Sequence, residues 1–258
     1  MYSYTIFSVY SWENREYYVK KLYLEKRVAV RSQWEYNNHI FPHNYIKLIV
    51  KEKMMVFIND SLTVVLVGDW NKLYIQPEWV ANNIYETAEI EIGVNGQGSD
   101  FSVSYKCNNV IISPEQGKVI FSATNTERNS LEKLSLCVNN FLEKAYTTEL
   151  FAYGLNGKFF DEDASIFAEV LDAMSDTSQI LDNGYEIMAT KINRTLSKNG
   201  KVINMDSNLV NARLEINFNE HHSNPEEKPV FSFDLLNGFI KECSEIVKTL
   251  GYELEGEE

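Results

Sequence analysis

The chain has 258 residues, of which 44% are hydrophobic and 13% aromatic, enough for the packed core of one large domain or two small ones. Its 24 basic and 37 acidic residues give a formal net charge of -13, which disfavours nucleic acid and anionic membranes as partners. There is no apolar run of about 18 residues, and residues 1–6 lack the basic and apolar parts of a secretory leader, so we expect neither a membrane span nor a signal peptide.

The charge is unevenly spread along the chain. Residues 1–53 carry 9 basic and 5 acidic side chains, whereas residues 151–258 carry 9 basic and 20 acidic ones. A strongly acidic region favours fast, salt-sensitive association with a basic protein. Plain solubility is the alternative explanation of the same acidity.

The first part of the chain predicts strands with short connections. Alternating apolar residues indicate a strand at 2–10, and β-rich segments follow at 45–50, 54–58 and 62–67. Residues 59–61, Asn-Asp-Ser, are typical of a hairpin turn between the last two segments. Short connections of this kind predict an antiparallel meander or sandwich.

Residues 86–94 alternate between apolar and acidic side chains. Ile92 and Val94 share one side of the predicted strand, and Glu89 and Glu91 share the other. The pattern predicts a half-buried strand with an acidic face in water. The loop at 95–100 is expected to close a hairpin; it is no phosphate loop, because it lacks the Lys-Ser/Thr ending and precedes a strand.

A strand–turn–strand–helix unit at residues 105–146 forms the predicted seam between the two halves of the fold. The turn lies at 113–117, and the strand at 118–123 is apolar enough to be central and covered on both faces. A helix follows at 130–146, because its apolar residues recur every three or four positions. These residues are Leu131, Leu134, Val138, Phe141, Leu142 and Ala145.

The next segment predicts helices. Glycines mark a break at 152–157, and a helix is expected at 161–176, with Asp161, Glu162 and Asp163 in the first turn, where the helix dipole favours acidic side chains. Residues 184–197 fit a second helix slightly better than a strand that turns at Asn199-Gly200.

The end of the chain repeats the strand–loop–strand–helix order of the seam. A strand at 209–217 and a polar loop at 219–228 lead to a short strand at 229–233. A helix at 234–250 follows, with Asp234 as its N-cap and Gly251 as its stop. Because the two copies share no residue-level identity, a common motif used twice is a simpler explanation than an ancient duplication.

Together these elements predict an α+β fold. An antiparallel β-rich half, a meander or a sandwich, occupies residues 1–150 with its closing helix. An acidic, helix-rich half at 151–258 follows and ends in the strand–loop–strand–helix unit. The two halves also fit one continuous domain.

The sequence contains no motif that indicates a catalytic centre, a cofactor or a metal site. His39 and His43 have helical metal-ligand spacing, but Pro42 opposes a helix there. His221 and His222 are adjacent, and adjacent side chains on a strand point to opposite faces. An enzyme, such as a metal-dependent hydrolase or nuclease, would need residues that only the fold brings together. The first suspects are Asp161, Asp163, His221 and His222. A divalent-metal site could in principle also be assembled from the carboxylates of Asp161, Glu162, Asp163 and Asp172.

The three cysteines, Cys107, Cys137 and Cys243, are odd in number and widely spaced, and two of them face the core on predicted helices. This pattern indicates reduced, buried thiols in the cytoplasm.

The composition therefore favours a non-enzymatic protein that binds and neutralises a basic protein. A compact α+β body with an acidic half is typical of bacterial immunity proteins, which block a toxin by occluding its site. A phage-encoded inhibitor of a host defence protein, including a DNA mimic, fits the same properties. The predicted binding residues are the acidic Asp161, Glu162 and Asp163, and Trp70 and Trp79, which lie with Tyr74 and Tyr85 in the least regular part of the β-rich half.

Overall fold

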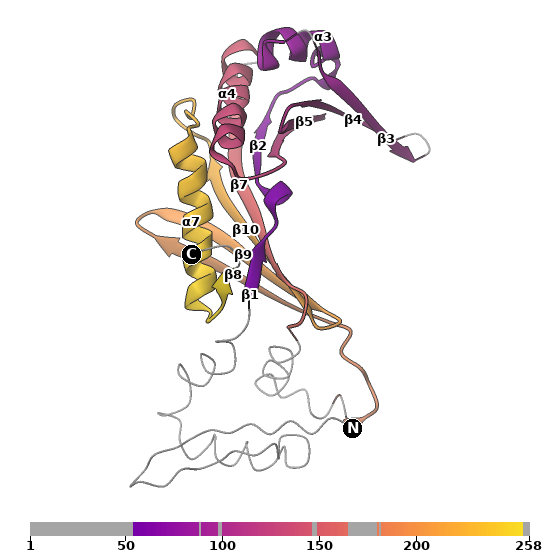
Figure 1. Ribbon diagram of the computed structural model, residues 1–258, viewed down its shortest axis with the longest axis vertical. Coiled ribbons are helices and arrows are strands. Elements are labelled where there is room, and N and C mark those ends of the chain that lie inside the picture. The colour runs from indigo at the N-terminus through magenta and orange to yellow at the C-terminus, as the bar shows by residue number, and fades with distance from the viewer. Residues whose placement is uncertain are drawn as a thin grey trace.

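The computed structural model describes residues 54–254, apart from 88, 98–99, 146–148, 165–179 and 181. In these residues one large, mostly antiparallel sheet dominates, with the strand order β3-β4-β5-β6-β2-β7-β10-β9-β8. Two long helices, α4 and α7, lie one after the other along the same side of the sheet (Figure 1). Predictions at residues 1–53, including His39 and His43, and at 165–176, including Asp172, lie outside the described residues.

The strands are β1 (Met54–Phe57), β2 (Thr63–Gly68), β3 (Glu91–Gln97), β4 (Asp100–Cys107), β5 (Val110–Glu115), β6 (Lys118–Ala123), β7 (Leu150–Asp161), β8 (Ala189–Lys198), β9 (Lys201–Val210), β10 (Arg213–Ser223) and β11 (Glu253–Leu254). The helical elements are η1 (Asn59–Ser61), η2 (Lys72–Tyr74), α3 (Pro77–Val80), η3 (Ala81–Tyr85), α4 (Arg128–Lys144) and α7 (Phe233–Thr249).

The seam helix is confirmed. α4 buries the predicted face of Leu131, Leu134, Val138, Phe141 and Leu142 against the sheet. The strand before it, β6, does lie in the middle of the strand order, but only alternate side chains are buried, Val119, Phe121 and Ala123. The prediction that this strand is covered on both faces is therefore wrong for the described residues, in which the second face is half-buried.

The predicted hairpin at residues 59–61 is wrong. β1 pairs antiparallel with the last residues of β7, and β2 pairs antiparallel with the first residues of β7. β1 and β2 therefore run in the same direction along β7 and do not form a hairpin. The turn of η1 is built into this edge: the backbone N–H of Lys158 donates to Ser61 Oγ (2.8 Å), and the N–H of Ile58 donates to the Lys158 carbonyl (2.9 Å). These bonds replace the ladder bonds that the turn interrupts.

The second half is not helix-rich, and this part of the fold prediction is wrong. β7, β10, β9 and β8 form antiparallel pairs there, and α7 is the one long helix among the described residues after 150. The glycines taken as a break lie inside β7. A Cβ at Gly157 would lie 3.1 Å from the ring of Phe57 and 3.4 Å from that of Phe239, so glycine there lets α7 approach the sheet.

Residues 184–197 do not form the helix that their spacing favoured. They end in β8, which forms a hairpin with β9 through Asn199 (φ 53°) and Gly200 (φ 81°), as the strand alternative predicted. Two residues with positive φ are the signature of a tight hairpin turn, and this local geometry prevails over an apolar spacing that fits both structures.

The second strand–loop–strand–helix unit is also wrong, because residues 229–233 form no strand. The side-chain amide of Asn139 on α4 binds both backbone groups of Phe231, at 2.8 and 2.9 Å, and Lys228 Nζ donates to the Leu142 carbonyl. The segment is thus fixed along a helix and not along a sheet. The N-cap of α7 is Ser232, whose hydroxyl accepts from the N–H of Leu235 (3.2 Å), so the prediction of Asp234 as the N-cap is wrong; Asp234 lies in the first turn. The helix ends before Gly251 as predicted.

Strands from before and after residue 150 belong to the same sheet, because β7 pairs with β2 on one side and with β10 on the other. The division into two halves at that residue stays a prediction. No helix in the described residues combines the length and the apolar character that crossing a membrane requires.

Candidate functional site

One end of the molecule combines acidic and exposed apolar side chains. We call it the acidic end and define it as residues 69–97, which include η2, α3, η3 and β3 and lie at the top and right of Figure 1. Residues 54–100 contain one basic residue, Lys72, and seven acidic ones. Five of the acidic side chains belong to the acidic end and are exposed: Asp69, Glu78, Glu86, Glu89 and Glu91.

The irregular backbone of the acidic end is held by buried side chains. The Tyr85 hydroxyl lies 2.7 Å from the Tyr105 carbonyl and 3.0 Å from the Val110 carbonyl, and the Tyr105 hydroxyl donates to the Ile75 carbonyl (2.8 Å). Asn140 of α4 donates to the Ile84 carbonyl (3.1 Å). These bonds tie the segment between Ile75 and Tyr85 to β4, β5 and α4, so the acidic end is a structured surface.

Burial changes the chemistry of the central tyrosine. Loss of solvent around the ring raises the pKa of Tyr85 well above its usual value, and the neighbouring thiols of Cys137 and Cys107 act in the same direction. Tyr85 therefore stays a neutral hydrogen-bonding group, and its role is to hold the segment.

Four large apolar side chains at the acidic end face the solvent. Leu73 is 69% exposed and Tyr74 65%, and Ile92 and Val94 on β3 are 53% and 62% exposed. β3 was predicted to bury Ile92 and Val94, and this prediction is wrong. They share a side of the sheet with the buried Tyr105 on β4, but the described residues that cover this side do not reach β3.

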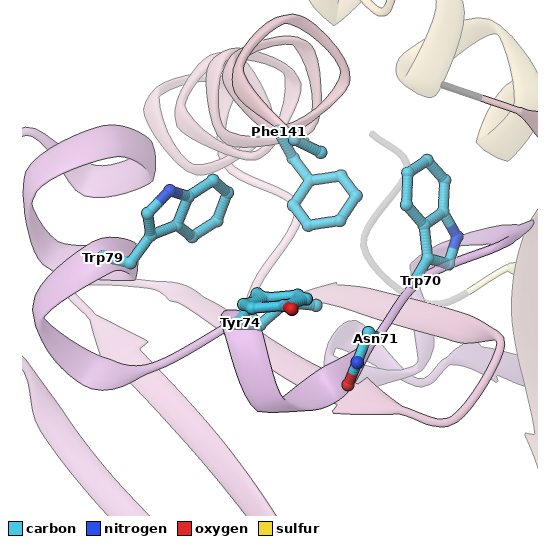
Figure 2. A pocket seen from close by; sticks show the side chains of 7 residues that line it. Trp70, Asn71, Tyr74, Trp79 and Phe141 are labelled. Atoms are coloured by element: carbon cyan, nitrogen blue, oxygen red, sulfur yellow. The ribbon is translucent and has the colours of Figure 1, made fainter. Parts of the chain in front are cut away.

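Of the two predicted binding aromatics, Trp70 is a core residue and Trp79 is partly buried against the core. Figure 2 shows them on either side of Phe141, which descends from α4. The ring centroids of Trp70 and Phe141 are 5.0 Å apart, and those of Trp79 and Phe141 are 6.1 Å apart, both edge to face. A hollow of about 20 Å³ between these rings, bounded also by Tyr74, is apolar and has room for about one water molecule.

The acidic triplet does not lie in the first turn of a helix. Asp161 ends β7 on the covered side of the sheet, is 7% exposed, and accepts the N–H of Asp163 at 2.9 Å. Glu162 is exposed and pairs with Arg213 at 3.6 Å. Asp163 is exposed in the turn that follows. The structure thus separates the triplet into one buried side chain and two exposed ones.

A second group of charges lies between β9, β10 and α7. Glu220 is 3% exposed; its Oε2 lies 2.6 Å from Lys201 Nζ, and its Oε1 lies 2.7 Å from His222 Nε2. Lys201 also contacts Glu242 of α7 at 2.6 Å. Burial would lower the pKa of Lys201, but the two carboxylates raise it above its usual value. We call Lys201, Glu220, His222 and Glu242 the ion cluster.

A hollow of about 200 Å³ adjoins the ion cluster. Its lining combines the apolar Leu196, Ile203 and Ile246 with Lys201 and Glu242. Since Lys201 is already held by two carboxylates, the cluster connects α7 to the sheet and presents no open charge to a ligand.

The suspected enzymatic residues do not converge. Asp161 lies opposite Leu214 on β10, and His221 is seven residues further along that strand, about 24 Å away at 3.4 Å per residue. His221 is exposed, whereas the ring of His222 stacks on Tyr153 with centroids 4.3 Å apart. Within the described residues, no three His, Cys, Asp or Glu side chains are placed to hold a metal ion.

The three cysteines are free thiols, and Cys137 and Cys243 are buried on α4 and α7, as predicted. Burial raises the pKa of the Cys137 thiol to about 12. A thiol that keeps its proton is a poor nucleophile, so Cys137 and Cys243, whose pKa values burial raises, act as small core side chains.

The sequence matches no known family model and no curated protein. The sequence alone did not show which apolar residues of the acidic end are exposed, and the fold was needed to identify them. Tyr74 stood beside the tryptophans in the sequence, but its exposure depends on the direction of η2. For Ile92 and Val94, the alternating pattern was read correctly, and only the extent of the covering layer was unknown.

Proposed function

We propose that this protein binds a basic protein through the acidic end and neutralises it by covering its functional surface, as an immunity-type inhibitor does. The observation that carries the proposal is the concentration of exposed carboxylates at the acidic end, where residues 69–97 hold five exposed acidic side chains and one basic residue, Lys72. Such a surface attracts a basic partner from solution and raises the association rate at low salt.

The exposed apolar side chains supply the second part of a binding surface. Leu73 and Tyr74 are mostly exposed on η2, and Tyr74 is of the residue type most often found at the energetic centre of interfaces. Charges alone give fast but weak binding, whereas buried aromatic and aliphatic groups give long-lived complexes. Tyr74 thus replaces Trp70 and Trp79 as the expected aromatic anchor.

Two of the carboxylates are already paired within the chain, Glu86 with Lys144 (3.1 Å) and Glu91 with Lys106 (3.3 Å). Exposed pairs of this kind contribute little and exchange easily, so a partner's lysine or arginine competes for them at small cost. A toxin or effector that acts on nucleic acid is basic, and its binding site is the surface that an acidic inhibitor would cover. The free cysteines favour a reducing compartment, so we place this interaction in the cytoplasm.

The test is affinity capture from the native organism at low and high salt. The bait is compared with the variant Glu78→Gln/Glu89→Gln/Glu91→Gln and with a control of equal charge change, Glu226→Gln/Glu227→Gln/Asp234→Asn, whose residues are also exposed.

We expect one stoichiometric basic protein that is retained by the control, reduced by the first variant and lost at high salt. The purified partner should also lose its activity when one equivalent of this protein is added. Equal retention by both variants, or an unimpaired activity of the partner, would refute the proposal.

A further inference from the structure

The two outer edges of the sheet differ in how they are protected. β8 closes one edge and carries three basic side chains, Lys191, Arg194 and Lys198. β3 closes the other edge with the sequence EIGVNGQ, which contains neither lysine nor proline. Charged side chains, especially lysine, and proline are the usual means by which an edge strand is kept from pairing with another chain. Among the described strands, β8 carries three such charged side chains, whereas β3 carries one, Glu91, at its first residue.

β3 also presents two chemically distinct faces. Ile92 and Val94 project on one face, next to Val103 and Tyr105 of β4, and Glu91 projects on the other. All of its side chains from Glu91 to Gly96 are exposed. A strand added to this edge would bury the two apolar side chains and meet a carboxylate on the opposite face.

We infer that β3 is the docking strand, and that it takes up an extended basic segment of the partner in which apolar residues alternate with lysine or arginine. This inference rests on the proposed function and specifies its partner chemistry. The apolar positions of the segment contact Ile92 and Val94, the basic positions contact Glu91 and Glu89, and the backbone pairs with the edge of β3 that no other described strand occupies. The seven residues of β3 span about 24 Å, which accommodates a strand of about seven residues.

The alternating side chains of β3 make this arrangement specific. Backbone pairing supplies the affinity of an added strand, and the alternate side chains select its sequence. A basic segment without alternation would meet the same carboxylates but would leave Ile92 and Val94 in water. The order of the residues in the segment, and not only its charge, therefore determines binding.

The probe is an acetylated and amidated nonapeptide in which valine and lysine alternate. Its control has the same composition with the valines and the lysines in two blocks. We expect the alternating peptide to bind the full chain roughly tenfold or more tightly than the block peptide, and Ile92→Ser/Val94→Ser to remove this difference. Hydrogen exchange should slow at residues 91–97 when the alternating peptide binds.

Two variants separate the inference from the proposed function. If Glu89→Gln/Glu91→Gln weakens both peptides while Ile92→Ser/Val94→Ser changes neither, strand addition is refuted and the acidic binding surface stands. If neither variant changes binding, both are refuted. Slow exchange, in the free protein, of the amides of residues 91–97 that do not bond to β4 would also overturn the inference, because the outer edge of β3 would then be paired within the chain.

Discussion

Lys201 of the ion cluster is the residue whose loss the structure predicts most sharply. Glu220 is 3% exposed, and the ion pair of its Oε2 with Lys201 Nζ at 2.6 Å compensates its charge. Removing one partner of a buried pair costs about 3–5 kcal/mol of folding stability, because a buried charge is left uncompensated.

We expect Lys201→Met to lie at the lower end of this range. Lys201 is 29% exposed, which admits some water, and His222 still contacts the other oxygen of Glu220 at 2.7 Å. A loss of about 3 kcal/mol corresponds to a decrease in Tm of about 6–12 °C for a chain of this size. Methionine keeps most of the volume of the aliphatic stem, so the loss reports the charge.

The assay is urea unfolding of four proteins followed by circular dichroism. Lys198→Met is the matched control, since Lys198 is exposed on the same β8–β9 hairpin, and we expect it to cost less than about 0.5 kcal/mol. Lys201→Met/Glu220→Gln should recover much of the loss, because the second change removes the uncompensated charge. Equal midpoints for the two lysine variants, or no recovery in the double variant, would refute the role given to the ion cluster.

Three further results follow from the packing and the titrating groups. Phe141→Ala should cost about 3–5 kcal/mol in urea unfolding, because Trp70, Trp79 and Phe121 all contact its ring, whereas the half-exposed Phe151→Ala should cost less than about 1 kcal/mol; similar losses would contradict the aromatic core. Gly157→Ala should cost about 1–3 kcal/mol through contact with Phe57 and Phe239, whereas Gly238→Ala on α7, whose Cβ meets nothing within 4 Å, should be neutral or stabilising; a neutral Gly157→Ala would contradict the close approach of α7. The folded-state pKa values of Tyr85, Cys137 and Lys201 are raised, so the folded protein keeps these protons to a higher pH than the unfolded chain does. The free energy of unfolding should therefore be unaffected by these groups below about pH 9 and should fall above it by about 1.4 kcal/mol per pH unit for each titrating group. A constant urea midpoint from pH 8 to 11 would contradict the raised pKa values.

The parts of the fold that were predicted correctly are those in which one local pattern decides. The apolar face of α4 recurs at helical spacing over 17 residues, and no strand fits such a pattern. Gly251 ends α7 with φ 95°, as expected for a C-terminal glycine. Both features are set by residues within a few turns of each other.

The errors arose where distant residues decide. The backbone of Phe231 is bound by Asn139, 92 positions earlier in the chain, and no local rule indicates that pairing. Gly154 and Gly157 were taken as a break, but β7 needs them where Asn219 and α7 come close. Ala189–Lys198 carries a spacing compatible with both structures, and the Asn199-Gly200 turn was the better guide.

The candidate site was predicted only in its chemistry. The acidic charge of residues 151–258 and the aromatic Trp70 and Trp79 were expected to bind a basic partner, whereas the surface proposed from the structure lies at residues 69–97. The particular residues differ, because Trp70 and Asp161 are buried and Tyr74, Ile92 and Val94 are exposed. Exposure depends on how far the layer formed by α3, η3 and α4 extends over the sheet, and that extent is a property of the whole fold.

The most direct test of the account is hydrogen exchange of the full chain, read by mass spectrometry, with and without the basic protein recovered by affinity capture. The account predicts slower exchange at residues 69–97, strongest at β3, and little change at β8 and in the ion cluster. Protection confined to residues 182–254, with residues 69–97 unchanged, would contradict it.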